Sequence, residues 1–142
     1  MVSTIKNRQA FRKLAITRLY EAKVLLDNHK YSGAYYLCGY ALECGLKACI
    51  SKTIKRTQFP DLEFVKAIWV HKLRQLVKQA SLDGDWQKIM NSDKQFAANW
   101  GVVKDWDVSS RYERIRKKEA TDFYNAVADP SSGVLQWIKL NW

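Results

Sequence analysis

Residues that break helices are scarce in this chain, which has six glycines and two prolines among its 142 residues. Such scarcity indicates few tight turns and long helices. Nowhere does the sequence sustain, over more than a few residues, the alternation of apolar and polar side chains that is typical of a strand. The sequence therefore predicts an all-α fold, an up-and-down four-helix bundle with one or two additional short helices.

Apolar residues recur at helical spacing in several segments, which are separated by short polar or irregular stretches. Asp85 is placed to cap a helix, and Ser110 with Glu113 forms the pattern of a capping box at the start of another. Because the chain has no internal repeat and no linker, we expect one domain over residues 1–142. Helices are expected at about residues 4–28, 32–53, 65–80, 85–100, 110–128 and 134–142.

The net charge of the chain is +10 at neutral pH, and it is unevenly spread. Residues 1–30 and residues 51–80 each carry seven Lys or Arg against two acids, whereas residues 81–110 carry three against five. Two basic zones suit a polyanion or an acidic partner protein, and a solvated surface that favours solubility is the alternative. Charge alone does not separate nucleic acid from an acidic protein.

Several features bear on where the protein works. The N-terminal residues are polar and basic with no apolar run behind them, which is not typical of a signal peptide. The longest uncharged run, residues 31–42, is too short to span a bilayer, so we expect no membrane contact. The three cysteines lie in one apolar segment, and on a helix Cys38 and Cys49 would be about 16 Å apart, beyond disulfide reach. We therefore expect reduced thiols, a cytoplasmic protein, no metal site and no cofactor.

The least polar segment, residues 31–50, nonetheless carries one carboxylate, Glu43, and one amine, Lys47. This pair fits three interpretations: a partly exposed ion pair, a buried structural pair, or part of a binding site. A buried Glu43 needs a partner, for which an arginine from another segment is suitable. On a helical wheel, polar and aromatic residues share one face, at Tyr36, Tyr40, Glu43 and Lys47. The opposite side carries small residues that would let another backbone approach closely: Ala34, Cys38, Ala41, Gly45 and Cys49.

Four stretches spread along the chain carry a family pattern: RLYEAKVLLDNHKYSGAYYLCGYALECGLKA (18–48), HKLRQLVKQA (71–80), NWGVVKDWDVSSRYE (99–113) and LQWI (135–138). Together they resemble the HEPN domain (higher eukaryotes and prokaryotes nucleotide-binding), in particular a branch of small prokaryotic members. The resemblance implies a helical bundle that usually forms a homodimer. Many HEPN proteins are metal-independent RNA endonucleases of toxin–antitoxin, CRISPR or phage-defence systems. Others are thought to bind nucleotides, RNA or a nucleotidyltransferase-type partner encoded alongside, such as an antitoxin.

The ribonuclease motif of that family is an Arg, then four to six intervening residues, then a His, near the start of a late helix. Arg111 matches the arginine, but the positions at which the histidine would stand hold Arg116, Lys117 and Lys118. His71 lies far upstream at a helix-start position, which indicates a capping or packing role. The resemblance thus implies a non-catalytic member that binds a nucleotidyltransferase-type partner, a nucleotide or RNA in a toxin–antitoxin or defence-type system.

Two other functions stay open. The first is a divergent metal-independent ribonuclease in which Arg111 stabilises charge and Tyr112 or Glu43 replaces the missing histidine. The second is a structural dimerisation module without a ligand.

Basic residues of the late segment are expected to share a helix face that contacts phosphates, or that is merely solvated: Arg111, Arg114 and Lys118. Trp106, beside the irregular stretch before them, is either a packing anchor or part of a binding surface. We expect the Glu43 face to point at the region of Arg111 and Tyr112. The resulting cleft would be lined by Tyr36, Tyr40, Glu43, Lys47, Trp106, Arg111, Tyr112, Arg114 and Lys118.

Overall fold

The computed structural model describes residues 7–54 and 69–142, and within them the chain is all-helical, with seven α-helices, one 3₁₀ helix and no strand. The predicted all-α class is therefore confirmed. The elements are α1 (Arg8–Asp27), α2 (Tyr31–Lys52), α4 (Leu73–Gln79), α5 (Asp83–Ser92), α6 (Lys94–Val103), the 3₁₀ helix η1 (Val108–Tyr112), α7 (Lys117–Ala128) and α8 (Val134–Asn141).

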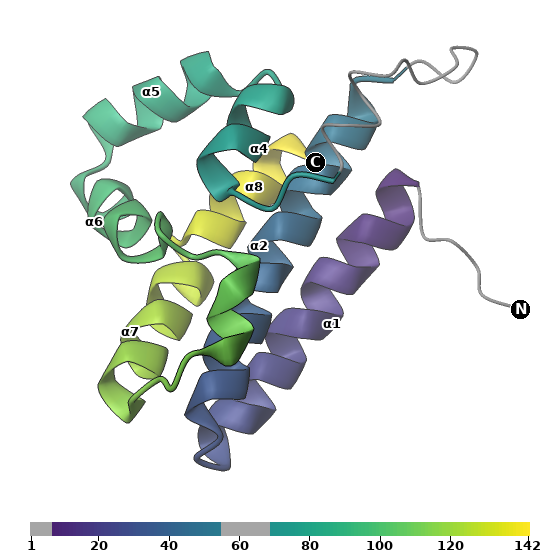
Figure 1. The fold of residues 1–142 in the computed structure, drawn as a ribbon. Coiled ribbons are helices and arrows are strands. Elements are labelled where there is room, and N and C mark those ends of the chain that lie inside the picture. Colours follow the sequence, from purple (N-terminus) through teal and green to yellow (C-terminus); the bar gives the residue numbers. More distant parts are fainter. Residues whose placement is uncertain (1–6, 55–68) are drawn as a thin grey trace, which may run out of the picture.

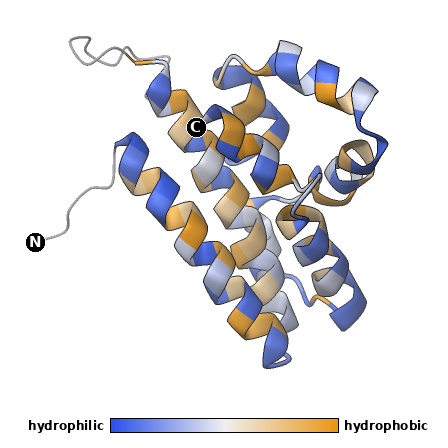
Figure 2. Cartoon of the chain, turned by 180° about the vertical axis from the view of Figure 1, so that it is seen from behind, coloured by the Kyte–Doolittle hydropathy of each residue, from blue (hydrophilic) through white to orange (hydrophobic). Residues whose placement is uncertain are grey.

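Helix α2 lies at the centre of the fold, with α1, α4, η1, α7 and α8 packed around it (Figure 1). Because only residues 28–30 join α1 to α2, the two helices run antiparallel along each other. Residues 41–50 of α2 are all buried, as expected of a helix that has neighbours on every side. Helix α1, by contrast, mixes hydrophobic and hydrophilic positions along its whole length (Figure 2).

Small residues of α2 allow close packing at Gly45 and Cys49, on the side that the wheel predicts, and also at Gly39, which lies outside that predicted set. A methyl group built at Gly39 would lie 2.1 Å from the indole of Trp106, and one built at Gly45 would lie 2.9 Å from a methyl group of Ile138 in α8. The Sγ of Cys49 donates to the carbonyl oxygen of Ile138 at 3.8 Å. The glycines thus bring α8 and the segment that carries Trp106 against the backbone of α2.

The predicted helix at 85–100 is wrong as a single element, because α5 and α6 meet at a break at Asp93. Asp93 has an extended backbone (φ −125°, ψ 99°), and its side chain accepts a hydrogen bond from the amide of Phe96 at 2.9 Å. It therefore caps α6. Asp85, the predicted cap, lies within the first turn of α5.

The predicted helix start at Ser110 is also wrong. Ser110 is buried inside η1, and Glu113 has an extended backbone (φ −90°, ψ 149°), so no capping box forms. Asp107 is instead the residue that caps the start of η1, because its side chain accepts a hydrogen bond from the amide of Val108 at 2.7 Å. The extended stretch after η1 is fixed to α2 by the amide of Ile115, which donates to Ser32 Oγ at 2.9 Å. Helix α7 then begins only at Lys117.

Three other expected helices agree with the structure where residues are described. The limits of α1, α2 and α8 lie within a few residues of the limits predicted for these three helices. Residues 4–6 of the predicted helix at 4–28 lie outside the described ranges. Residues 65–68 of the predicted helix at 65–80 also lie outside the described ranges. In the rest of that prediction, the chain becomes helical only at Leu73. No helix in these described ranges is both long and apolar enough to cross a bilayer.

The three cysteines should be unreactive while the protein is folded. Cys38, Cys44 and Cys49 are free and buried, and burial raises the pKa of each thiol to about 12. Since the thiolate is the reactive form, no thiol should react with Ellman's reagent at pH 8 in the native protein. All three should react in denaturant. Fast labelling of the native protein at pH 8 would contradict the close packing of α2.

Candidate functional site

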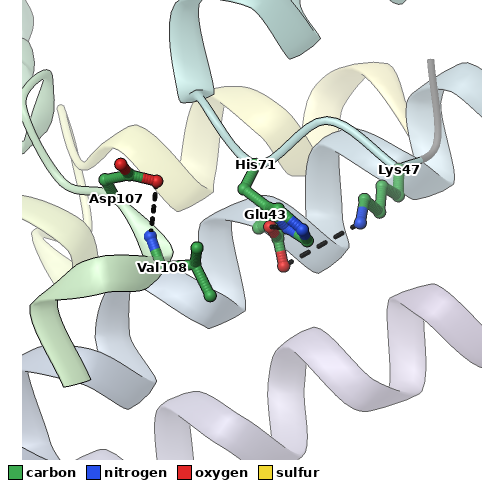
Figure 3. A network of polar contacts seen from close by, with 5 residues as sticks. All are labelled: Glu43, Lys47, His71, Asp107 and Val108. Carbon is green, nitrogen blue, oxygen red and sulfur yellow. Dashed lines mark hydrogen bonds and ion pairs between the residues drawn. The ribbon is translucent and has the colours of Figure 1, made fainter. Parts of the chain in front are cut away.

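The carboxylate of Glu43 is buried in the middle of α2, with 1% of the residue exposed. One oxygen, Oε1, contacts Nδ1 of His71, which lies just before α4, and the other, Oε2, lies 3.9 Å from Nζ of Lys47 (Figure 3). The side chain of Lys47 is 11% exposed, whereas that of His71 is 39% exposed. A carboxylate with almost no exposure to solvent thus lies between one buried amine and one half-exposed imidazole.

Burial raises the pKa of Glu43 above its ordinary value, because removal from water disfavours the charged form. Lys47 and His71 oppose that rise, and the carboxylate of Asp107 adds to it. Asp107 and Val108, at the start of η1, are seen beside the group in Figure 3. A buried carboxylate needs partners, and Lys47 and His71 provide them. The arrangement therefore fits a structural role for Glu43.

The predicted arginine partner of Glu43 is wrong. Its partners are His71 and Lys47, and no ion pair or hydrogen bond joins Glu43 to Arg111, both of which are described. The guanidinium of Arg111 lies instead over the ring of its neighbour Tyr112, 4.9 Å from the centroid. Helix α2 packs against η1, the element to which Arg111 belongs. The direct pairing of Glu43 with Arg111 is therefore wrong, and the cleft between the Glu43 face and the region of Arg111 and Tyr112 stays a prediction.

The aromatic part of the predicted site does come together. The rings of Tyr36 and Tyr40 are nearly parallel, with centroids 6.2 Å apart, and the ring of Tyr36 lies 5.9 Å from that of Trp106. Trp106 is 2% exposed and lies against Gly39. Of its two interpretations, packing anchor and binding residue, the packing anchor agrees with this burial.

A second group of predicted residues lies on the surface, in what is here named the basic segment, residues 111–118. Tyr112 is 79% exposed, and the guanidinium of Arg111 stacks on its ring. Its basic side chains are all exposed: Arg111, Arg114, Arg116, Lys117 and Lys118. Within residues 7–54 and 69–142, only Lys118 among them forms an ion pair, with Asp122 at 2.7 Å.

The expected common helix face of Arg111, Arg114 and Lys118 is wrong. Arg111 belongs to η1, Arg114 to the extended stretch after it, and Lys118 to the first turn of α7. The basic segment is therefore an ordered, irregular stretch of chain. Its backbone runs past α2 rather than along one helix, and its cations face solvent.

Of the two partners of Glu43, the sequence indicates Lys47, four residues on, but not His71. His71 is 28 residues away, and the only local signal was its place before a helix. Trp69, which the helical pattern places on one side with the buried Leu73 and Leu76, is 71% exposed. Among the residues that the structure describes, no group of three His, Cys, Asp or Glu side chains could hold a metal ion.

Comparison with known proteins gives this chain no relative. No family model matches it, and neither the curated proteins nor the solved structures yield a match.

Proposed function

We propose that this chain is a non-catalytic, HEPN-like RNA-binding protein and that the basic segment binds single-stranded RNA. The observation that carries the proposal is the exposed ring of Tyr112 with the Arg111 guanidinium stacked on it, inside a run of exposed cations. The HEPN bundle, the homodimer and the setting in a toxin–antitoxin or defence-type system are part of the same proposal and rest on the sequence resemblance.

The chemistry of the basic segment fits single-stranded RNA better than an acidic protein. Unstacked bases bind by stacking on aromatic rings and on the planes of arginine guanidinium groups. Arg111 covers one face of the Tyr112 ring, and the 79% exposure of that residue leaves room for a base on the other. Arg114, Arg116 and Lys117 have no ion-pair partner in the described ranges, so phosphates do not have to displace a carboxylate from them.

A binding role is also supported by what surrounds the candidate catalytic residues. Cleavage of RNA without a metal requires a general base near a group that stabilises charge. Glu43 is engaged by His71 and Lys47 and forms no ion pair or hydrogen bond with Arg111, both of which are described, while the ring of Tyr112 is covered by the arginine beside it. A ribonuclease built from Arg111 with Tyr112 or Glu43 therefore loses its geometric support.

Fluorescence anisotropy with a labelled single-stranded oligonucleotide should show salt-dependent binding. If four cations of the basic segment each neutralise one phosphate, the slope of log K against log salt should be roughly −3. Arg114→Ala should reduce the magnitude of this slope by about 0.7, whereas Lys88→Ala, an exposed lysine of α5, should leave it unchanged.

Other outcomes of the same titration would point to the alternative ligands. Competition of the labelled RNA by a mononucleotide would indicate a nucleotide site. A failure to bind any RNA at low salt, together with capture of a nucleotidyltransferase-type protein, would replace the proposal by a partner-binding role. Absence of every ligand, with substitutions altering only stability, would leave a structural dimerisation module.

A second candidate function is favoured by one contact, that between His71 and Glu43. A carboxylate on Nδ1 orients an imidazole and leaves Nε2 as the nitrogen that accepts a proton. Such a histidine could take the proton of a ribose 2′-OH, whose oxygen then attacks phosphorus. The 5′-oxygen leaves with a proton from water, and a 2′,3′-cyclic phosphate results.

This second candidate makes a different prediction in the same solutions. RNA incubated with the protein in EDTA would be cut, and His71→Asn, which can keep a hydrogen bond to Glu43, would abolish cutting. Intact RNA after incubation with the native protein would exclude it and would leave the binding proposal untouched.

A further inference from the structure

Helix α1 carries a row of large apolar residues on its solvent-exposed side. Ile16 is 52% exposed, Tyr20 71% and Val24 45%. They follow one another at i, i+4 and i+8, so they form a continuous stripe on the helix surface. Helix α1 lies at the margin of the fold in both views (Figures 1 and 2). A row of exposed apolar side chains on an outer helix indicates a contact surface.

The ends of this stripe carry opposite charges at equal distances from Tyr20. Lys13 lies seven residues before it and Asp27 seven residues after it, and both are exposed. At about 100° per residue, these two residues, with Ile16 and Val24, all lie within about 40° of the direction of Tyr20. These five residues are here named the α1 seam: Lys13, Ile16, Tyr20, Val24 and Asp27. Their spacing along the chain is symmetric about Tyr20.

We infer that the α1 seam is a self-complementary interface, which pairs antiparallel with the α1 seam of a second copy of this chain. A two-fold axis through Tyr20 would place Ile16 opposite the second copy's Val24, and Lys13 opposite its Asp27. Both charge pairs are then attractive, and no like charges face each other along the seam. Parallel pairing would set Lys13 against Lys13 and Asp27 against Asp27, so the charges favour the antiparallel arrangement.

Two neighbouring features fit this occupant. Asp27 already forms an ion pair with Lys23 of its own helix at 2.5 Å, and its two carboxylate oxygens can accept from a second amine as well. Beside the seam, a hollow of about 230 Å³ joins α1 to α7 and α8. Ile16 and Tyr20 line it together with Tyr124 and Leu135, which extend the apolar surface beyond one helix, and two lysines, Lys23 and Lys139, also line it. The interface concerns α1 alone and is independent of any function of the basic segment.

The oligomeric state of the full chain tests the inference. Light scattering coupled to gel filtration should give twice the mass of one chain within a range of about 1 µM to 1 mM. Tyr20→Arg puts two like charges on the axis and should give monomer, whereas Val102→Arg, at an exposed position of α6, should remain dimeric. Circular dichroism controls for folding. A native protein that stays monomeric over the whole range, or a Tyr20→Arg variant that stays dimeric, would overturn the inference.

Register is tested by exchanging the charges. Lys13→Glu alone should weaken the dimer by about tenfold, because each of the two symmetric pairs becomes repulsive. The double variant Lys13→Glu with Asp27→Lys should restore the native dissociation constant. Equal weakening by the single and the double variants would contradict antiparallel pairing.

A cross-link tests the position of the axis. Helices packed at about 8–10 Å bring facing residues within disulfide range, and the three native cysteines are buried. Mild oxidation of Tyr20→Cys should therefore give a covalent dimer, whereas Val102→Cys should not. Cross-linking of both variants to the same extent would show random collision and would refute the axis at Tyr20.

Discussion

Gly39→Ala is expected to destabilise the protein by about 2–3 kcal/mol, although alanine is normally the better helix former. The added methyl group would lie 2.1 Å from the indole of Trp106, which is 2% exposed and cannot move aside without disturbing the core. A gain of about 1 kcal/mol in helix propensity offsets only part of this overlap. Urea unfolding followed by circular dichroism measures the difference in the free energy of unfolding.

A matched control is available in α6. Gly101 is also inside a helix, and a methyl group built there meets nothing within 4 Å. Gly101→Ala should therefore stabilise the protein by up to about 1 kcal/mol. If Gly39→Ala proved as stable as Gly101→Ala, Trp106 would not pack on α2 as the structure has it, and the position of η1 would be wrong as well.

Glu43→Ala is expected to cost about 3 kcal/mol, because it leaves the buried amine of Lys47 without its counter-charge and removes the contact that holds His71. Glu21→Ala is the control for an exposed pair. Glu21 pairs with Arg18 at 2.9 Å with a side chain that is 43% exposed, so its loss should cost less than about 1 kcal/mol. Equal costs for the two variants would contradict the burial of Glu43.

The pH dependence gives an independent test of the same carboxylate. Because burial raises the pKa of Glu43, the folded state favours its protonated form more than the unfolded chain does. The stability that this carboxyl contributes is therefore full below its unfolded pKa and is lost as pH rises through the folded value. The free energy of unfolding of the native protein relative to that of Glu43→Gln should fall as pH rises from 4. A difference that grows with pH would contradict the direction of the shift.

The sequence was informative where short-range patterns decide the structure. Helical spacing located α1, α2 and α8 closely, and the wheel placed Tyr36, Tyr40, Glu43 and Lys47 on one side of α2. Local capping patterns were less reliable. Ser110 with Glu113 fits a capping box, but the following amide of Ile115 bonds to Ser32 in α2, and this distant contact keeps the stretch extended. Residues far apart in sequence thus override a local preference.

The second partner of Glu43, His71, could not be predicted for a related reason. The cost of burying a charge indicates that a buried carboxylate needs a partner, and the buried Glu43 does have one in Lys47. Which partner arrives depends on how the segment before α4 returns to α2, and no local pattern encodes that path. His71 reaches Glu43, whereas Arg111, the expected partner, turns to Tyr112. The chemistry of the site was predictable and its assembly was not.

The most direct test of RNA binding by the basic segment compares Tyr112→Ala with Tyr112→Phe in anisotropy titrations of a single-stranded RNA in EDTA. Tyr112 is 79% exposed, so neither change should alter stability. Loss of a stacked base should weaken binding by about 1–3 kcal/mol, roughly 5- to 150-fold, in the alanine variant, while the phenylalanine variant binds as the native protein does. The RNA should be recovered intact. Unchanged binding by Tyr112→Ala, or cleavage of the RNA by the native protein, would contradict the account.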